Sequence, residues 1–137
     1  MASYKISEIE GIGPAYSAKL QKAGLKTVND LLKKGAAAKG RKEIAAATGI
    51  DQKMILKWVN MADLFRVKGI GQEYSELLEK AGVDTVKELR NRNAQNLYAK
   101  MAEVNSAGRA LVRQLPGQKS VEKWVDQAKK MDPKVTY

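Results

Sequence analysis

The chain contains neither cysteine nor histidine. Without cysteine it has no disulfide and no thiolate metal ligand. Without histidine it lacks the commonest metal ligand and the usual general base near neutral pH. The sequence also has no GxxxxGK[ST] phosphate loop and no complete dinucleotide fingerprint. We therefore expect a protein that is not an enzyme and that holds no metal ion or cofactor.

Long apolar runs are also missing. No stretch approaches the roughly 20 apolar residues that a membrane-spanning helix needs. The first residues, MASYKISEIEGIG, lack the basic and apolar regions of a signal peptide. The lack of cysteine fits a reducing compartment. We expect a cytoplasmic protein with no membrane partner, and nothing in the sequence indicates a small-molecule substrate.

Positive charge is abundant in both halves of the chain. The 137 residues include 25 Lys and Arg against 15 Asp and Glu, a net charge of +10. Residues 1–64 have 11 basic and 6 acidic residues, and residues 65–137 have 14 and 9, so each half carries +5. A basic globule indicates nucleic acid or another polyanion as partner. A lysine-rich, solvated surface without a partner is the alternative interpretation.

An internal repeat divides the chain. IEGIGPAYSAKL at 9–20 returns as VKGIGQEYSELL at 67–78, and an ungapped alignment of 9–32 with 67–90 gives twelve identities in 24 positions. This similarity indicates a duplication. We predict an all-α chain of about nine or ten short helices, built from two units, 1–64 and 65–137. Because each unit is small, we expect both to share one core with approximate two-fold symmetry.

Local signals predict where the first helices of each unit begin and end. Pro14 suits the first turn of a helix, and Gly24 and Gly82 suit left-handed C-terminal caps. Thr27 with Asp30, and Thr85 with Glu88, resemble capping boxes that start the next helix. The second pair matches the pattern better, because Glu is usual at the last position.

The later part of each unit repeats more loosely. We predict a helix that ends at Gly49, another that Asp51 caps and that runs to about Leu64, and in the second unit a helix that Ser120 caps. The expected buried faces are Ile55, Trp58, Val59 and Ala62 in the first unit and Val121, Trp124, Val125 and Ala128 in the second. The tryptophans lie 66 residues apart instead of 58, so we place eight additional residues near SAGRALVRQLPG. Base stacking is possible for both tryptophans, but their helical spacing with aliphatic residues favours the core.

Two glycine hairpins stand at the centre of the repeat: Gly11–Ile12–Gly13 and Gly69–Ile70–Gly71. Glycine allows positive φ angles and close approach of two helices, and the isoleucine fills the gap between them. The following helix begins with unpaired N–H groups, which can bind a phosphate without reading the base sequence. Packing alone is the alternative role. We expect Val in place of Gly13 or Gly71 to destabilise the fold.

These residues resemble the helix-hairpin-helix superfamily, whose pattern is apolar-x-Gly-apolar-Gly. IEGIG and VKGIG both satisfy it. Two such motifs look like the tandem helix-hairpin-helix domains of DNA-repair and recombination proteins, a SAM-like, five-helix type of fold. The whole chain, including ILKWVNMADL and VEKWVDQAKKM, is also similar to an uncharacterised bacterial family, domain of unknown function number 4332. The resemblance implies a duplicated helix-hairpin-helix fold packed as one compact domain, and no assigned activity.

The resemblance to the superfamily implies that both glycine hairpins contact phosphate. Many DNA-binding members have Lys or Arg after the second glycine, whereas this chain has Pro14–Ala15 and Gln72–Glu73. Nearby carboxylates, Glu10, Glu73 and Glu76, oppose an anion. The basic candidates for phosphate contact are Lys19 and Lys22 near the first hairpin, Arg66 and Lys68 near the second, and Lys39, Arg41 and Lys42 in KKGAAAKGRK at 33–42, which we expect to be an exposed loop.

Three functions remain open from the sequence. We favour a non-enzymatic module that binds the DNA backbone without sequence preference, through hairpin amides and Lys or Arg side chains. The alternative is a protein-interaction adaptor, because compact five-helix units also serve as docking domains. A remote third is an accessory subunit of an enzyme.

Overall fold

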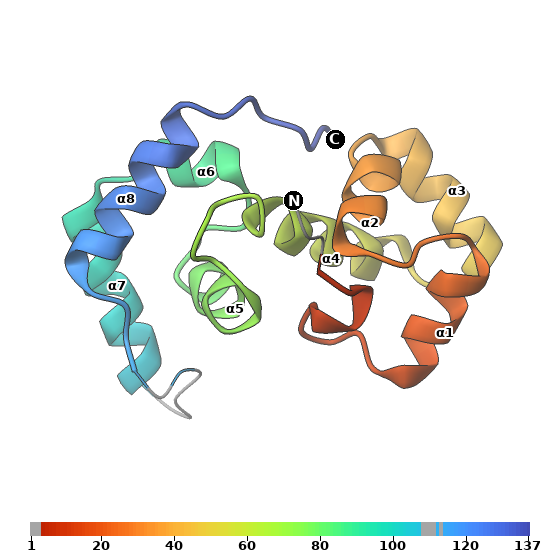
Figure 1. The fold of residues 1–137 in the computed structure, drawn as a ribbon, viewed down its shortest axis with the longest axis horizontal. Helices are drawn as coiled ribbons and strands as arrows, with labels where there is room; N and C mark the ends of the chain where they lie inside the picture. The colour runs from red at the N-terminus through yellow and green to blue at the C-terminus, as the bar shows by residue number, and fades with distance from the viewer. Residues whose placement is uncertain (1–3, 108–111, 113) are drawn as a thin grey trace. The chain divides into compact units, whose positions relative to one another are not determined.

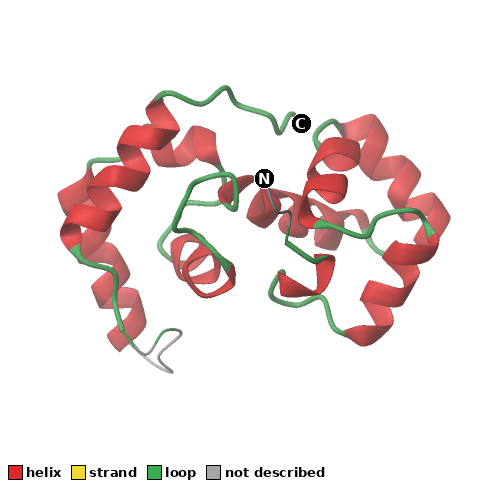
Figure 2. Ribbon diagram, in the orientation of Figure 1, coloured by secondary structure: helices red, strands yellow, loops and turns green. Residues whose placement is uncertain are grey.

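A computed structural model describes residues 4–107, 112 and 114–137. Within these residues the chain forms eight α-helices and one short 3-10 helix, with no β-strand (Figures 1 and 2). A single isolated β-bridge pairs Lys5 with Thr27. The all-α class is confirmed.

The helices divide between the two halves of the repeat. The first half contains η1 (Ile6–Glu8), α1 (Pro14–Lys22), α2 (Val28–Gly35), α3 (Ala38–Thr48) and α4 (Gln52–Leu64). The second half contains α5 (Gln72–Lys80), α6 (Val86–Arg90), α7 (Ala94–Ser106) and α8 (Gln118–Lys129).

The chain folds as two compact units. Unit 1 comprises Met1–Asp63 and Lys134–Tyr137, and unit 2 comprises Leu64–Pro133. The last four residues therefore belong with the N-terminal half, which nothing in the sequence indicated. Within unit 1, Val135 is buried and the Thr136 N–H donates to the Ala36 carbonyl at 2.8 Å.

The sequence repeat appears in the backbone of both units. α1 and α5 have nine residues each and begin 58 positions apart. In both hairpins the isoleucine N–H donates to the carbonyl three residues earlier: Ile12 to Ile9 and Ile70 to Val67, each at 3.1 Å. The first helical hydrogen bond is also equal, from Ser17 to Gly13 and from Ser75 to Gly71, each at 2.9 Å.

The ends of α1 and α5 use glycine in the predicted way. Gly24 has a φ angle of +87° and Gly82 one of +96°, the left-handed region in which glycine is favoured. The next residue closes the cap, with Leu25 N–H donating to Leu20 O at 2.9 Å and Val83 N–H to Leu78 O at 2.8 Å. These glycine caps are confirmed.

The capping boxes differ from the prediction. At the start of α2, the Thr27 hydroxyl accepts from the Asp30 N–H, and the Asp30 carboxylate accepts from the Thr27 N–H, so this box is complete. At the start of α6, Thr85 accepts from the Glu88 N–H at 3.2 Å, while the Glu88 carboxylate accepts from Arg92 one turn later. The expectation that the second box is the better one was wrong, because Arg92 competes for its carboxylate.

α4 and α8 carry the predicted buried faces. All eight of the expected residues are buried, including Trp58 and Trp124, so both tryptophans are confirmed as core residues. Three residues, 49–51, precede α4 and eleven, 107–117, precede α8, a difference of eight. The additional residues predicted near SAGRALVRQLPG fall partly on 108–111 and 113, which lie outside the described residues. Asp51 caps α4 through a 2.7 Å bond from the Lys53 N–H. Ser120 does not cap α8, which begins earlier at Gln118 after Gly117.

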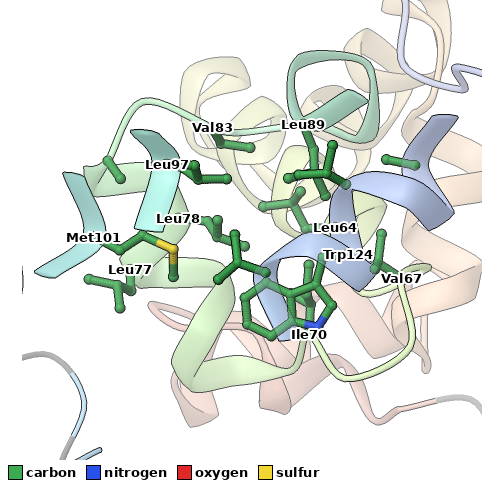
Figure 3. Close-up of a cluster of buried hydrophobic side chains, with 14 of the residues drawn as sticks. Leu64, Val67, Ile70, Leu77, Leu78, Val83, Leu89, Leu97, Met101 and Trp124 are labelled. Carbon is green, nitrogen blue, oxygen red and sulfur yellow. The ribbon is translucent and has the colours of Figure 1, made fainter. Parts of the chain in front are cut away.

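The core of unit 2 gathers side chains from every helix of that unit (Figure 3). α8 packs against both α6 and α7, and α5 packs against α7 (Figure 1). Trp124 lies in this cluster among Leu64, Val67 and Ile70. The apolar residue of the second hairpin is therefore part of the core that holds the hairpin in place.

Glycine allows α2 to approach both α3 and α4 closely. A Cβ on Gly40 would lie 1.7 Å from the Lys34 carbonyl oxygen, and one on Gly35 would lie 2.5 Å from Val59. No side-chain adjustment could relieve the first contact, because the neighbour is backbone. The expectation of an exposed loop at 33–42 was wrong, since α2 extends to Gly35 and α3 begins at Ala38.

Candidate nucleic-acid interface

The two hairpins have the same backbone conformation, but the second glycine of each behaves differently from our expectation. Gly11 and Gly69 have φ angles of +93° and +97°. Gly13 and Gly71 have φ angles of −82° and −119°, and a Cβ on either would meet nothing within 4 Å. The prediction that Val at Gly13 or Gly71 would strain the fold was therefore wrong. The positions that require glycine are Gly11 and Gly69.

The first hairpin presents free backbone donors. Gly13 is the N-cap of α1 and makes no side-chain cap hydrogen bond. The N–H groups of Gly13, Ala15 and Tyr16 have no acceptor among the described residues. Pro14 contributes no N–H. Two N–H groups of the first helical turn, together with that of Gly13, therefore remain available at the positive end of the α1 dipole.

Uncapped helix starts are not confined to the hairpins. α3 and α8 also begin without a side-chain cap, at Ala37 and Gly117. By contrast, Thr27, Thr85 and Asn93 cap α2, α6 and α7 through their side chains. What distinguishes α1 and α5 is the positive-φ glycine, Gly11 or Gly69, two residues before the N-cap.

The side chain of Gln127 on α8 forms hydrogen bonds with the backbone of the second hairpin at Lys68. Its side-chain amide accepts from the Lys68 N–H at 3.1 Å and donates to the Lys68 carbonyl at 3.3 Å. The residue at the corresponding position of unit 1 is Met61, which cannot make this pair. The N–H groups of Gly71, Glu73 and Tyr74 have no acceptor in the described part of the chain.

The charges near the first hairpin favour an anion. The first turn of α1 contains no acidic residue, and Lys19 and Lys22 are exposed on the same helix. The Lys19 ammonium lies 5.9 Å from the centre of the Tyr16 ring, so it is held near the start of α1. Glu10 is the carboxylate closest in sequence to this hairpin.

The charges near the second hairpin are less favourable. Glu73 lies in the first turn of α5, where it occupies the positive end of the helix dipole. Arg66, one of the predicted phosphate contacts, instead donates to the Asp132 carbonyl at 2.7 Å. The Lys68 side chain is exposed. The two hairpins thus share a backbone but differ in their electrostatics.

Carboxylates in unit 1 serve the protein's own structure. Glu8, Asp30 and Asp51 accept hydrogen bonds from backbone N–H groups at helix starts. Glu43 pairs with Lys34 at 2.5 Å, and both Glu10 and Asp63 take part in other interactions. The donated Lys26 N–H lowers the pKa of Asp30, and the hydrogen-bonded Lys34 ammonium lowers that of Glu43.

Several exposed lysines of unit 1 lie outside ion pairs, although the charges of Lys33 and Lys39 help to lower the pKa of Asp30 and of Glu43. Unit 1 has twelve Lys and Arg against six Asp and Glu, and unit 2 has thirteen against nine. The exposed lysines that form no ion pair with a described residue include Lys19, Lys22, Lys33, Lys39 and Lys42. Lys39 and Lys42 are three residues apart on α3, which packs against α1, and so share one side of that helix.

Arg41 has a structural position. The residue is only 6% exposed. Its guanidinium donates to the carbonyls of Gly35 at 2.9 Å, Ala36 at 3.0 Å and Thr136 at 2.6 Å. It also lies 5.9 Å from the centre of the Tyr137 ring. The expectation that Arg41 is exposed with Lys39 and Lys42 was wrong, because Arg41 closes the C-terminal end of α2 and fastens the last residues of the chain.

The indole nitrogens of both tryptophans lie beside the hairpins, which the sequence did not predict. Trp58 Nε1 lies 3.4 Å from the position that a Cβ on Gly11 would occupy. Trp124 Nε1 lies 2.9 Å from the corresponding position on Gly69. The 66-residue spacing hid this equivalence, since the hairpins repeat at 58. Each indole nitrogen thus lies against the positive-φ glycine of its own hairpin.

The described residues contain no group of three or more Asp and Glu side chains arranged to hold a metal ion. None of their helices is both long enough and apolar enough to cross a membrane.

Comparison with known proteins identifies the family. Residues 10–131 match the family described as Domain of unknown function (DUF4332), and the chain belongs to it. Neither a search of curated proteins nor a search of solved structures found a match.

Proposed function

We propose that this chain binds the sugar-phosphate backbone of DNA, without sequence preference and without catalysis, through two helix-hairpin-helix modules. In this proposal each unit is one module of a duplicated, SAM-like fold. The observation that carries the proposal is the start of α1. There the backbone N–H groups of Gly13, Ala15 and Tyr16, at the end of the first glycine hairpin, have no acceptor among the described residues, and the unit has an excess of basic residues. Backbone amides at a helix start bind phosphate oxygens directly.

The electrostatics of unit 1 support the same proposal. Its carboxylates are engaged with backbone N–H groups, with Lys34 or in other interactions, while Lys19 and Lys22 on α1 and Lys42 on α3 form no ion pair with a described residue. Such lysines add sequence-independent affinity by releasing counterions from the nucleic acid. The first hairpin is the stronger of the two sites, since Glu73 opposes an anion at the second.

A protein-interaction adaptor is the alternative function. Such a role calls for an exposed apolar patch. The large apolar side chains exposed in the described residues are those of Tyr4 and Tyr137, and Tyr137 already contacts Arg41. The surface of these residues therefore favours the nucleic-acid proposal over the adaptor.

Fluorescence anisotropy with a labelled duplex of mixed sequence tests the proposal. We expect non-specific affinity, with Kd of about 10⁻⁴–10⁻⁶ M at physiological salt. The double variant Lys19→Ala/Lys22→Ala should weaken binding about tenfold, and Lys39→Ala/Lys42→Ala by a similar factor, if each lysine approaches one phosphate.

Lys100→Ala provides the matched control. Lys100 is exposed on α7 and already pairs with Glu103 at 3.8 Å, so its loss changes the net charge with little effect on any hairpin. The proposal fails if the wild-type chain binds no duplex and no single strand at low salt. It also fails if Lys100→Ala weakens binding as much as the loss of Lys19 or Lys39, because then only overall charge matters.

A further inference from the structure

The fold provides no acceptor for the indole N–H groups of Trp58 and Trp124. The two residues are 1% and 4% exposed, and no described residue accepts a hydrogen bond from either nitrogen. Neither nitrogen is fully enclosed, so each N–H can reach solvent or a ligand. The same donor without a protein partner occurs at equivalent places in the two units. This repetition points to a ligand in common.

Each unpaired N–H lies beside the positive-φ glycine of a hairpin. Around the position of a Cβ on Gly11, the one heavy atom within 4 Å is Trp58 Nε1. Around the same position on Gly69, the neighbours are three atoms of the Trp124 ring, and Nε1 is the nearest. A side chain at either glycine would cover the indole nitrogen. The glycine therefore keeps this N–H uncovered in addition to adopting a positive φ angle.

The indole nitrogens retain access to the surface. Among the described residues, Asn60 Oδ1 is the side-chain polar atom that is both fully enclosed and without a partner. The two indole nitrogens also lack a partner, but they are not among the fully enclosed atoms, so each retains some exposure to solvent. Figure 3 shows the Trp124 ring beside Ile70, the central residue of the second hairpin.

Tyrosines on the helices that follow the hairpins fix the orientation of both rings. Tyr16 and Trp58 have ring centres 5.2 Å apart at an interplanar angle of 60°, and Tyr74 and Trp124 have centres 5.3 Å apart at 49°. Such tilted contacts are favourable, and they hold the Trp58 ring against α1 and the Trp124 ring against α5. Each N–H is thus a rigid donor beside the same helix start that presents the free amides.

We propose that the indole N–H of Trp58 is a hydrogen-bond donor to the phosphate that the first hairpin binds, and that Trp124 has the same role at the second hairpin. This inference rests on the proposed function and adds a side-chain donor to the backbone amides. The ligand is a tetrahedral oxyanion with oxygens free on two sides, as in a phosphodiester. One oxygen faces the amides of Gly13 and Ala15, and the other faces the indole. The first hairpin is occupied at lower ligand concentration because no acidic residue lies in the first turn of α1.

A nitrogen-15 NMR titration of the full chain with a short mixed-sequence DNA duplex tests this inference. The chain has two tryptophans, so it gives two indole signals, which single Trp→Phe variants assign. We expect the Trp58 indole signal to move to lower field as the duplex is added. It should saturate at the same duplex concentration as the amide signals of Gly13 and Ala15. The Gly117 amide, at an uncapped helix start without a glycine hairpin, is the internal control and should not move.

The variant Trp58→Phe removes the donor and keeps an aromatic ring in the core. We expect the folded variant to bind the duplex roughly tenfold more weakly, as for loss of one hydrogen bond to a charged group. Val59→Ala on the same helix is the matched control, because it weakens the unit 1 core without removing a donor and should keep wild-type affinity. If Trp58→Phe does not fold, the wild-type titration decides alone.

The outcomes separate this inference from the proposed function. If the Gly13 and Ala15 amides shift while the Trp58 indole stays unchanged, the indole inference is overturned and the proposed function stands. If the duplex binds while neither the amides nor the indole shift, both the inference and the role of the hairpins are overturned. Joint saturation of the indole and amide signals supports both.

Discussion

Replacing Arg41 by Ala should destabilise unit 1 without a specific effect on nucleic-acid binding. The guanidinium donates to three carbonyls, those of Gly35, Ala36 and Thr136. Two of them lie at the C-terminal end of α2, where a cation also interacts favourably with the helix dipole. Removal of Arg41 takes a donor from each of these carbonyls and leaves the last residues of the chain attached to the end of α2 through the bonds from Thr136 to the Ala36 carbonyl.

The size of the effect follows from these three hydrogen bonds. Hydrogen bonds from a charged donor contribute about 1.5–3 kcal/mol each, but they are not additive. The Gly35 bond is buried, whereas water can replace the partly buried bonds to Ala36 and Thr136. We therefore expect a loss of about 2–4 kcal/mol in the free energy of unfolding. For a small domain this corresponds to a melting temperature lower by about 10–20 °C.

Thermal unfolding followed by circular dichroism measures this change. Arg41→Lys should recover only part of the loss, since one ammonium cannot reach three carbonyls with the geometry of the guanidinium fork. The exposed variants Lys39→Ala and Lys42→Ala should stay within about 0.5 kcal/mol of wild type. The reasoning is refuted if Arg41→Ala melts at the wild-type temperature while its affinity for duplex DNA falls, because Arg41 would then contact phosphate as the sequence had suggested.

Three further predictions concern the hairpins and the caps. In urea titrations, Gly69→Ala should lower the free energy of unfolding by about 1–3 kcal/mol, because the residue has a positive φ angle and its Cβ would lie 2.9 Å from Trp124 Nε1. Gly71→Ala should change the free energy of unfolding by less than about 0.5 kcal/mol. Asp30→Asn should be less stable than wild type at neutral pH. Because the pKa of Asp30 is lowered in the folded state, the difference should shrink as the pH falls below the ordinary value of 3.8 and vanish once the pH is below the lowered pKa; equal stability of the two proteins at pH 7 would exclude a role for this carboxylate. Glu73→Lys should tighten duplex binding at the second hairpin by up to about thirtyfold, since it changes the charge by two units and each is worth about 1 kcal/mol at a few ångströms in a water-like medium. Unchanged anisotropy titrations would mean that the second hairpin binds no phosphate.

Features that depend on neighbouring residues in sequence could be predicted well. Pro14 begins α1, Gly24 and Gly82 end α1 and α5 in the left-handed conformation, and Gly49 ends α3. Each of these follows from local backbone constraints, which the residue type alone determines. The eight additional residues before α8 could also be predicted, because Trp58 and Trp124 mark equivalent helix faces and lie 66 residues apart instead of 58.

Features that depend on distant partners could not be predicted. Arg41 appeared to belong to a basic loop, and only the fold brings the Thr136 carbonyl to its guanidinium. Arg92 takes the Glu88 carboxylate from the predicted capping box. The sequence showed that two glycines matter in each hairpin but not which one has the positive φ angle, since this depends on how the chain enters the hairpin. The contact between the Trp58 indole and Gly11 could not be predicted either, because it joins residues that are far apart in sequence.

The salt dependence of duplex binding by the wild-type chain tests the central claim most directly. If the first hairpin and the lysines of α1 and α3 together engage about three to five phosphates, the plot of log K against log salt should have a slope of about −2.7 to −4.5. Duplexes of different base sequence should give the same slope and the same affinity. An affinity that does not change with salt, or an absence of binding at low salt, would contradict the account and leave the protein-interaction adaptor as the function to pursue.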